Sequence, residues 1–293
     1  MPPSTDDASR APVSLRRLET SEEFRASEEV QRAAWGMSSD SPVPAAIQRA
    51  IADNGGLVLG AFAGTALVGL SLGFLGREGP KLFHYSHITA VRPEWQNRHV
   101  GRSLKRFQRE EVLAQGLDEI RWTFDPLQSR NAFVNVRELG GVPDRYFVRY
   151  YGPMGDAINE GLETDRLRLV WSLRDRRVTD RLEGHRPTPA EDEERWHAST
   201  PLLETAVGPT GLRRPARVRP PVETRLALEV PADLGSVRTR DQGSARRWRE
   251  ATREAFTLAF ASGYRVDDFA VLAVGGERRG VYFLSRPEEP GGA

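Results

Sequence analysis

The stretch from Val91 to Leu104, Val-Arg-Pro-Glu-Trp-Gln-Asn-Arg-His-Val-Gly-Arg-Ser-Leu, constrains the fold most, because it joins an apolar strand to a helix through a basic, amide-rich turn. The first N–H groups of a helix have no partner within the helix, and the helix dipole adds positive potential behind them. Such a turn attracts anions, above all phosphate groups. Gly101 allows a ligand to approach the backbone, and Arg98 and Arg102 add positive charge. The stretch therefore predicts a pyrophosphate site between a strand and a helix.

The composition indicates a globular protein of one large or two modest domains, since the chain has 293 residues and 39% hydrophobic content. No apolar run approaches the roughly 20 residues of a membrane span, and the N-terminus lacks the basic and then apolar segments of a signal peptide. We therefore expect no membrane association and a cytoplasmic location. The absence of cysteine excludes disulfides, thiolate metal sites and a cysteine nucleophile, and we expect no metal.

The charge balance argues against nucleic acid as a partner. Lysine and arginine together number 42 and aspartate and glutamate 41, which gives a formal net charge of +1 and no global field toward a polyanion. Only Lys81 and Lys105 are lysines. The basic cluster from Arg213 to Arg219 is interpreted as a solvated linker, with a nucleic-acid patch as the alternative.

Hydrophobic patterning and glycine or proline breaks predict, over residues 13–175, a strand, two helices, three strands, a helix, a strand, a helix and two strands. The expected strands are 13–18, 57–62, 67–72, 82–91, 119–124, 145–150 and 168–173. The expected helices run from Ser21 as N-cap to Gly36, from Pro44 to Ala50, from Val100 to Gly116 and from Ser129 to Leu139.

Beyond residue 175 the sequence changes character. Residues 176–221 are rich in charge and proline and predict a linker with one short helix. Residues 222–293 predict a small α/β domain with strands at 225–230, 269–272 and 281–284 and a helix through Trp248. This domain is expected to pack on the first domain or on a partner subunit, as in a homodimer.

The turn after residue 91 resembles the acyl-CoA-binding motif of the GNAT acyltransferase superfamily, Gln/Arg-x-x-Gly-x-Gly/Ala, with Gln96 first and Gly101 last. His99 stands where the first glycine is expected, so either the turn opens slightly or the imidazole contacts the nucleotide. The predicted order of elements over residues 13–175 is also that of the GNAT family. The resemblance implies an α/β GNAT acyltransferase fold, with a mixed, mostly antiparallel sheet flanked by helices, followed by the smaller α/β domain.

The resemblance implies acyl transfer from an acyl-CoA, acetyl-CoA or succinyl-CoA, to a small-molecule amine without a covalent enzyme intermediate. In GNAT proteins the pantetheine lies along the strand before the turn and the pyrophosphate lies at the turn. The implied cofactor-binding residues are Ile88, Thr89, Ala90, Val91, Gln96, Asn97, Arg98, His99, Val100, Gly101, Arg102, Ser103 and Asn131.

Catalysis requires a group that takes the proton of the acceptor amine, and His87 is the leading candidate. It lies close to a position where many relatives carry a glutamate, and a hydrogen-bonded strand histidine is the alternative reading. Many relatives place a tyrosine acid where this chain has Val136. Tyr146 is therefore taken as a substitute acid, and Asp125 as a further catalytic candidate.

The segment Trp122–Leu127, together with Tyr151–Gly152, Asp165–Arg166 and Trp171, resembles a less-characterised bacterial branch of GNAT proteins with an added C-terminal region. That branch suggests amino-acid N-acylation, including succinylation. The acceptor is then expected to contact Asn135 and Arg149, the latter as a cation for a carboxylate. The changes at positions 99 and 136 leave open an alternative function, a non-catalytic acyl-CoA sensor or interaction module.

Overall fold

A computed structural model describes residues 12–36, 42–152 and 161–286 of the chain. These residues divide into two compact units. The first unit lies within residues 12–122, and the second comprises residues 123–152 and 161–286. The division falls after Trp122 and not near residue 175, so the predicted N-terminal domain contributes to both units. Each unit is considered by itself.

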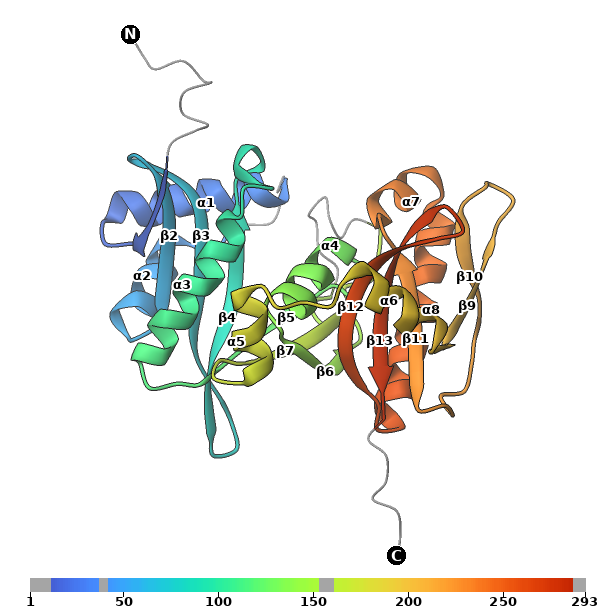
Figure 1. The fold of residues 1–293 in the computed structure, drawn as a ribbon. Helices are drawn as coiled ribbons and strands as arrows, with labels where there is room; N and C mark the ends of the chain where they lie inside the picture. Colours follow the sequence, from blue (N-terminus) through green and yellow to red (C-terminus); the bar gives the residue numbers. More distant parts are fainter. Residues whose placement is uncertain (1–11, 37–41, 153–160, 287–293) are drawn as a thin grey trace, which may run out of the picture. The chain divides into compact units, whose positions relative to one another are not determined.

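The first unit is a mixed sheet with helices (Figure 1). Its strands follow the order β1-β2-β3-β4-β5, antiparallel except for the parallel pair of β4 and β5. The elements are β1 (Val13–Arg17), α1 (Ser21–Trp35), α2 (Ala45–Asp53), β2 (Leu57–Ala63), β3 (Ala66–Glu78), β4 (Lys81–Val91), the 3-10 turn η2 (Pro93–Trp95), α3 (Val100–Ala114) and β5 (Glu119–Phe124), which leads into the second unit.

Helix α1 begins one residue earlier than the sequence suggested. Its N-cap is Thr20, not Ser21, because the Thr20 hydroxyl accepts from the Glu23 N–H while the Glu23 carboxylate accepts from the Thr20 N–H. This reciprocal pair is a capping box, whose pattern is threonine followed three residues later by glutamate. Gly36 ends the helix in the left-handed conformation that glycine favours.

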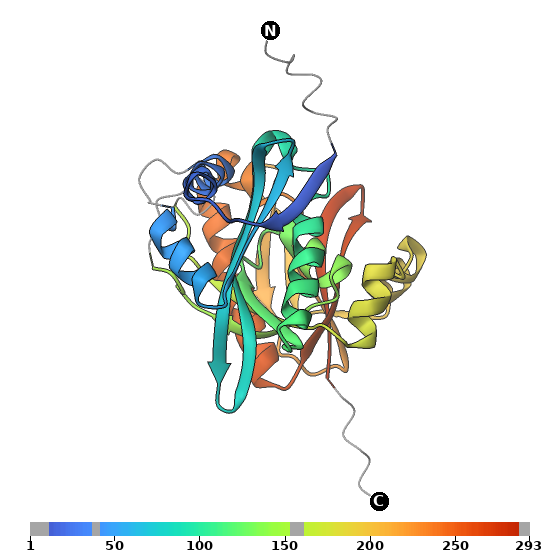
Figure 2. The ribbon, with the colours of Figure 1, turned by 90° about the vertical axis from the view of Figure 1, so that its left-hand side faces the viewer.

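The helices of the first unit cover both faces of the sheet (Figure 2). On one face, Leu70 and Leu72 of β3 belong to a buried apolar cluster with Phe24 and Val30 of α1. On the other face, a Cβ at Gly69 would meet side chains of α3 at 3.1 Å, so glycine permits the close approach of that helix. Helix α3, which starts at the predicted phosphate turn, is thereby fixed against the sheet.

The second unit contains three groups of paired strands and several helices. Strand β7 pairs with β6, β9 with β10, and a four-stranded sheet has the order β12-β13-β11-β8. The elements are α4 (Ser129–Ala132), the π-helix η3 (Phe133–Glu138), β6 (Val142–Phe147), β7 (Arg166–Ser172), α5 (Arg176–Glu183), α6 (Pro189–His197), β8 (Thr200–Pro201), β9 (Leu203–Val207), β10 (Arg213–Val218), β11 (Arg225–Pro231), α7 (Leu234–Arg240), α8 (Gln242–Ala261), β12 (Arg265–Val274) and β13 (Glu277–Ser285).

The segment predicted as a linker instead forms two helices and three short strands. Buried ion pairs hold it to distant parts of the chain: the Asp268 carboxylate accepts from Arg137 and from Arg181, each at 2.7 Å. The charges that suggested a solvated linker are thus partners inside the unit. Strand β6 also lies three residues earlier than the predicted strand 145–150, and the last three predicted residues form a turn.

Removal of the chain after Leu173 is expected to prevent residues 123–152 from folding as they do here. The truncation deletes the partners of three groups, because Asp125 pairs with Arg249, the Ser129 hydroxyl donates to the Pro231 carbonyl, and the Tyr282 hydroxyl donates to the Pro126 carbonyl. A buried charge without its partner is strongly destabilising. Expression of a 1–173 fragment, with thermal unfolding of the soluble fraction, measures this. A soluble fragment with a cooperative transition equal to that of the full chain would contradict the expectation.

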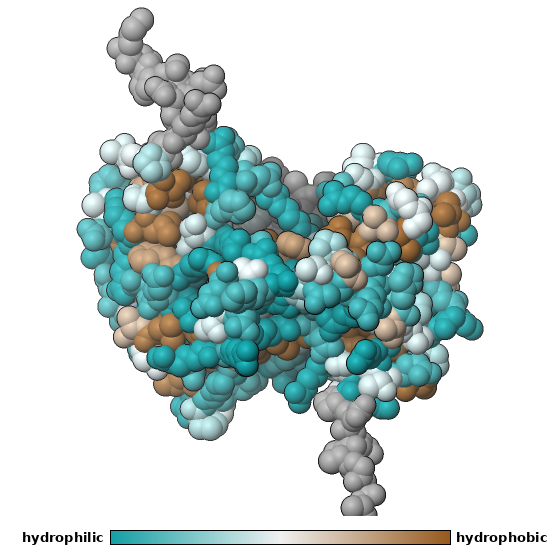
Figure 3. All heavy atoms as spheres, in the orientation of Figure 1, coloured by the Kyte–Doolittle hydropathy of each residue, from teal (hydrophilic) through white to brown (hydrophobic). Residues whose placement is uncertain are grey.

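In the view of Figure 3, hydrophilic side chains cover most of the visible surface and hydrophobic ones form scattered groups. Among the residues described, no helix has the length and apolar composition that a membrane span requires.

Candidate functional site

The predicted base, His87, lies at an irregularity of β4. In the ladder with β3, Ile88 is opposite Leu72 and Ser86 is opposite Gly73, so His87 is an extra residue on β4. Such a β-bulge bends the strand and re-aims side chains, and bulges occur often next to active sites. The residue chosen from the sequence therefore marks the point where β4 departs from regular pairing.

The other edge of β4 is paired along only part of its length. The parallel ladder with β5 joins His84 to Ile120 and Tyr85 to Arg121, and no further pair of it lies within the first unit. The predicted pantetheine strand, Ile88 to Val91, lies beyond this ladder and pairs with β3 on its opposite edge. Within this unit, the second edge of that segment is available to an extended ligand.

The turn that follows β4 has the backbone of a glycine-rich loop without its glycines. Asn97 and His99 have φ of 63° and 61°, in the left-handed region that side chains rarely adopt. His99 is the N-cap of α3, and no side chain caps that helix. In contrast, α1, α5, α6 and α8 each have a side-chain cap. The N-terminus of α3 is therefore prepared for an external acceptor of its N–H groups.

Two residues of the motif shape this turn. The Gln96 side chain donates to the Val91 carbonyl at 3.2 Å, which ties the turn to the end of β4. A Cβ at Gly101 would meet only the Val91 side chain, at 3.7 Å, an ordinary contact. The fold itself therefore does not require glycine at position 101, and the missing side chain leaves room on the outer side of the first helical turn.

Replacement of His99 by glycine is expected to raise the free energy of unfolding by about 1 kcal/mol, because a left-handed residue with a side chain is strained by about 1–2 kcal/mol and glycine loses part of that gain to chain entropy. Urea unfolding measures the change. Asn97→Gly is the matched comparison at the neighbouring left-handed residue, with a smaller expected gain because asparagine tolerates this region better. A destabilised His99→Gly variant would mean that the imidazole makes a contact that the fold needs.

The His87 side chain is only partly covered and lies among aromatic rings. Its ring centroid lies 6.1 Å from that of Phe74 and 6.3 Å from that of Tyr85, and these two rings are 5.5 Å apart. Partial burial lowers the pKa of His87 below its ordinary value. The lowered pKa favours the neutral imidazole, which is the form that accepts a proton.

In the second unit, Asp125 and Tyr146 are held by partners. The Asp125 carboxylate accepts two hydrogen bonds from the buried Arg249, at 2.8 and 2.6 Å, and one from the Leu127 N–H at 2.9 Å. The Tyr146 hydroxyl donates to Asp165 at 2.8 Å. Burial, and next the charge of Asp165, raise the pKa of Tyr146 well above its ordinary value. These contacts favour structural roles, and the catalytic roles of both residues remain predictions.

Replacement of Arg249 by methionine is expected to lower the free energy of unfolding by about 3–5 kcal/mol, since it leaves the buried Asp125 carboxylate without its partner. The double variant Asp125→Asn with Arg249→Met removes the isolated charge and should recover much of the loss. Urea unfolding of both variants measures this. A double variant that is stable but inactive would instead return Asp125 to the catalytic candidates.

The remaining predicted contacts also belong to the second unit. Asn131 is exposed on α4, whereas Asn135 is buried in the π-helical turn η3. Arg149 is exposed in the turn after β6, with φ of 51°, and is paired with Glu163.

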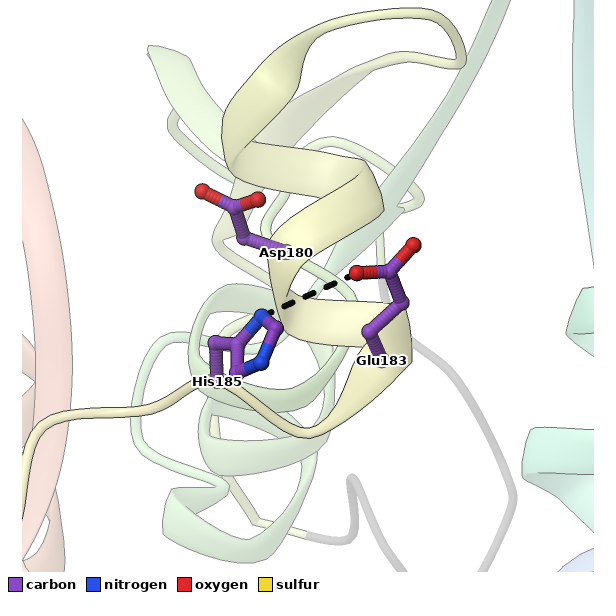
Figure 4. A group of neighbouring side chains, drawn as sticks. All are labelled: Asp180, Glu183 and His185. Atoms are coloured by element: carbon purple, nitrogen blue, oxygen red, sulfur yellow. Dashed lines mark ion pairs between the residues drawn. The ribbon is translucent and has the colours of Figure 1, made fainter.

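One group of side chains with metal-ligand chemistry occurs in the part of the chain that the structure describes, Asp180, Glu183 and His185 at the end of α5 (Figure 4). Their ligand atoms lie within 4.8 Å of one another. The His185 Nδ1 lies 3.7 Å from a Glu183 oxygen, and both side chains are largely exposed. Exposed acidic groups of this kind are common, and this one carries no metal assignment.

A buried polar cluster, not predicted from the sequence, lies beneath β4. Lys105 of α3 donates to the Ser86 hydroxyl and to the Gln108 amide oxygen, and Gln108 contacts the His84 ring. A Cβ at Gly73 would clash with that ring, 2.1 Å from its Nε2. The sequence contains one signal for this cluster, the rarity of lysine: Lys105 is one of only two lysines among the 42 lysine and arginine residues.

Among known proteins, solved structures of acetyltransferases are similar to part of this chain. No family model matches the sequence, and no curated protein matches it. Solved structures similar to the chain include the ribosomal-protein-S18-alanine N-acetyltransferase from Escherichia coli, at 13% identity and TM-score 0.45 over 55% of this chain and 94% of that one. Others are a putative acetyltransferase from Salmonella typhimurium with its cofactor acetyl-CoA, at 15% identity and TM-score 0.45 over 56% and 95%, and an N-acetyltransferase from Staphylococcus aureus Mu50, at 12% identity and TM-score 0.45 over 56% and 100%.

The fold assignment rests on the elements of the chain itself. Their order, β1-α1-α2-β2-β3-β4-α3-β5-α4-β6-β7, is the order that the sequence predicted. The bulged β4 precedes the turn that carries the motif, and the uncapped α3 follows it. From Val13 to Ser172 the order of the described elements is the one that the resemblance to the GNAT family predicted.

Proposed function

We propose that this protein is an acyl-CoA-dependent N-acyltransferase that moves an acetyl or succinyl group to a small amine, with an amino acid as the expected acceptor. The observation that carries the proposal is the arrangement of three features that follow one another along the chain. Strand β4 is bulged at His87, its segment after the bulge has one edge without a partner in its unit, and α3, after the turn, begins without a side-chain cap. A thioester, an extended amide chain and a pyrophosphate occur in the same order along acyl-CoA.

In this proposal the pyrophosphate accepts from the N–H groups at the start of α3. The left-handed backbone at Asn97 and His99 turns the chain around the phosphates, and Arg98 and Arg102 add charge. The remaining contacts come from Gln96, Val100, Gly101 and Ser103 of the same turn. The anion supplies the acceptors that no side chain of the protein supplies at this helix end.

The pantetheine arm then lies along Ile88 to Val91, with its amides paired to the strand backbone as an added strand would be. The four residues span about 13 Å of extended backbone, which places the thioester near the bulge. His87 at the bulge takes the proton of the acceptor amine, directly or through water. Backbone N–H groups near the bulge stabilise the oxyanion of the tetrahedral intermediate.

Three residues of the second unit are assigned ligand contacts as separate parts of the proposal. Asn131, which is exposed, is proposed to contact the cofactor, and Asn135 and Arg149 the acceptor. Arg149 would offer its guanidinium to the carboxylate of an amino acid, in exchange for its present pair with Glu163. The chemistry as proposed requires no metal.

Binding of acyl-CoA is the first test. Acetyl-CoA, succinyl-CoA and free CoA should each raise the melting temperature of the full chain in proportion to affinity and concentration. The absence of any shift at millimolar concentrations, confirmed by calorimetric titration, would reject the proposal.

A non-catalytic acyl-CoA sensor is the second candidate, because Val136 is fully buried where many GNAT proteins have a tyrosine acid. Turnover separates the two functions. An enzyme releases free CoA, measured with a thiol reagent, when a panel of amino acids and small amines is added to acetyl-CoA or succinyl-CoA. A sensor binds the cofactor and releases none.

A further inference from the structure

Lys105 is a fully buried amine on the inner side of α3. Its Nζ lies 2.8 Å from the Ser86 Oγ, 3.0 Å from the Gln108 Oε1 and 3.8 Å from the centroid of the Trp122 ring. All four residues are less than 10% exposed and belong to the first unit. The cluster therefore belongs to the buried core of the first unit and is not a surface contact.

Lys105 differs from the other buried cations in its partners. Arg121, Arg137 and Arg249 each pair with a buried carboxylate. Lys105 has no carboxylate partner among the residues that the structure describes. An unpaired cation in a protein interior is costly, and this chain otherwise uses arginine almost exclusively. Lysine differs from arginine in one property that matters in the core, because it can lose its proton.

The cluster lies at the end of the parallel ladder that β4 and β5 form within the first unit. The last residues that this ladder joins there are Tyr85 and Arg121. Ser86 and Trp122 are the next residues of the two strands, and Lys105 contacts both. In the proposed function this is also the place where the acyl group ends, since the pantetheine runs back along β4 toward the bulge at His87.

The charge of Lys105 determines the direction of the hydrogen bond between Lys105 and Ser86. An ammonium has three donors and no acceptor, so Ser86 must accept from it and its own hydroxyl proton must point elsewhere. No acceptor for that proton occurs among the described residues. A neutral amine has a lone pair, and the Ser86 hydroxyl can then donate to Lys105 instead.

We propose that the Ser86 hydroxyl donates a hydrogen bond to the thioester carbonyl of the bound acyl-CoA, and that the Lys105 ammonium is the positioning group that turns the hydroxyl proton toward it. This inference rests on the proposed function. Ser86 keeps its proton throughout, so no bond is made or broken at the serine. The donor strengthens its interaction as negative charge develops on the carbonyl oxygen.

The groups around Lys105 define its titration. Burial lowers the pKa of Lys105 to about 7, so ammonium and amine are both populated near neutral pH. His84 is the titratable group that faces it from β4, and burial, followed by the charge of Lys105, lowers the pKa of His84 to about 3. From β5, strand alternation directs Glu119 and Arg121 to the face opposite Trp122, where they pair with each other. Lys105 is thus the group in this cluster that changes charge between pH 6 and pH 8.

The test is the infrared carbonyl stretch of acetyl-CoA, labelled with carbon-13 at the thioester carbonyl and bound to the full-length protein. A hydrogen bond to the carbonyl lowers this frequency. We expect a low-frequency band in the wild type at pH 6, its loss in Ser86→Ala, and its retention in Ser86→Thr. Ser27→Ala is the matched control, because Ser27 is an equally buried serine of the same unit that pairs with Gln48, away from β4.

The charge of Lys105 is tested in the wild type itself. The ammonium predominates below pH 7, so the low-frequency band should weaken as pH rises from 6 to 8.5. Lys105→Met should reduce the band and remove its dependence on pH. Dissociation constants for acetyl-CoA should change less than threefold in these variants, since the backbone and the helix turn hold most of the cofactor.

The outcomes separate the two proposals. Failure of acetyl-CoA to bind the wild type would reject the proposed function and the inference with it. Binding with the same carbonyl frequency in the wild type and in Ser86→Ala, or a wild-type band that does not change with pH, would overturn the inference alone. The pH series requires no variant, so it decides the question even if Lys105→Met does not fold.

Discussion

Replacement of Gly101 by glutamate is expected to abolish acetyl-CoA binding while the fold stays intact. The new carboxylate would stand in the first turn of α3, where the proposed pyrophosphate meets the helix N-terminus. Two unit charges about 4 Å apart at an effective dielectric constant of 20 repel by about 4 kcal/mol, roughly a thousandfold in affinity. An acidic residue in a first helical turn is favourable to the helix, so a loss of folding is not expected.

Calorimetric titration of acetyl-CoA into the variant measures this effect, and a urea unfolding curve verifies that the variant is folded. Gly101→Ala is the matched control, because an added Cβ meets only the Val91 side chain at 3.7 Å and adds no charge. A folded glutamate variant with wild-type affinity for acetyl-CoA would remove the phosphate turn from the site and leave the proposed function without its main support.

The helices and strands of the first unit were largely predictable because their signals are local. Strand β5 has the predicted limits, Glu119 to Phe124, and α1, α3 and β4 begin or end within about one residue of the apolar runs and glycines that indicated them. The turn between β4 and α3 was predictable for the same reason, since a strand end, polar residues and a helix start are adjacent in the sequence.

What the sequence did not reveal depends on partners far along the chain. Arg181 looked like part of a charged linker, yet its partner Asp268 lies 87 residues away and turns the segment into part of a folded unit. The bulge at His87 depends on the register between β3 and β4, which periodicity does not determine. The position of Lys105 was not predictable, because nothing in the adjacent sequence shows that its side chain turns inward to Ser86.

His99, which stands where the motif has glycine, shows how the surrounding structure can maintain a backbone conformation that the residue itself disfavours. The motif left two possibilities at His99, a turn that opens slightly or an imidazole that contacts the nucleotide. The backbone at His99 is left-handed and the side chain is exposed. The strain is maintained by the surrounding structure, in which β4 and α3 are both packed against β3. Strained backbone of this kind occurs often at ligand sites, which agrees with the assignment of this turn to the cofactor.

Replacement of His87 by alanine is expected to reduce the rate of CoA release by about a hundredfold to ten-thousandfold, the usual effect of removing a general base. The pKa of His87 lies below its ordinary value, so the wild type keeps its base at neutral pH and loses it only as pH falls through that lowered value. The deficit of the variant should shrink at high pH, because more of the acceptor amine is then already neutral. Affinity for acetyl-CoA should be nearly unchanged, since the imidazole holds none of the proposed cofactor contacts.

The measurement is the rate of thiol release from acetyl-CoA or succinyl-CoA with the best acceptor of the amine panel, over a range of pH. His87→Gln adds a variant that fills more of the space between Phe74 and Tyr85 and cannot act as a base, so a purely packing role would be rescued by it and a catalytic role would not. His185→Ala serves as the control for loss of an exposed histidine elsewhere in the chain. Near-normal turnover of His87→Ala at neutral pH would make His87 a structural residue of the bulge, and the proton would then have to leave the acceptor by another route, for which Tyr146 or water near Asp125 is the next candidate.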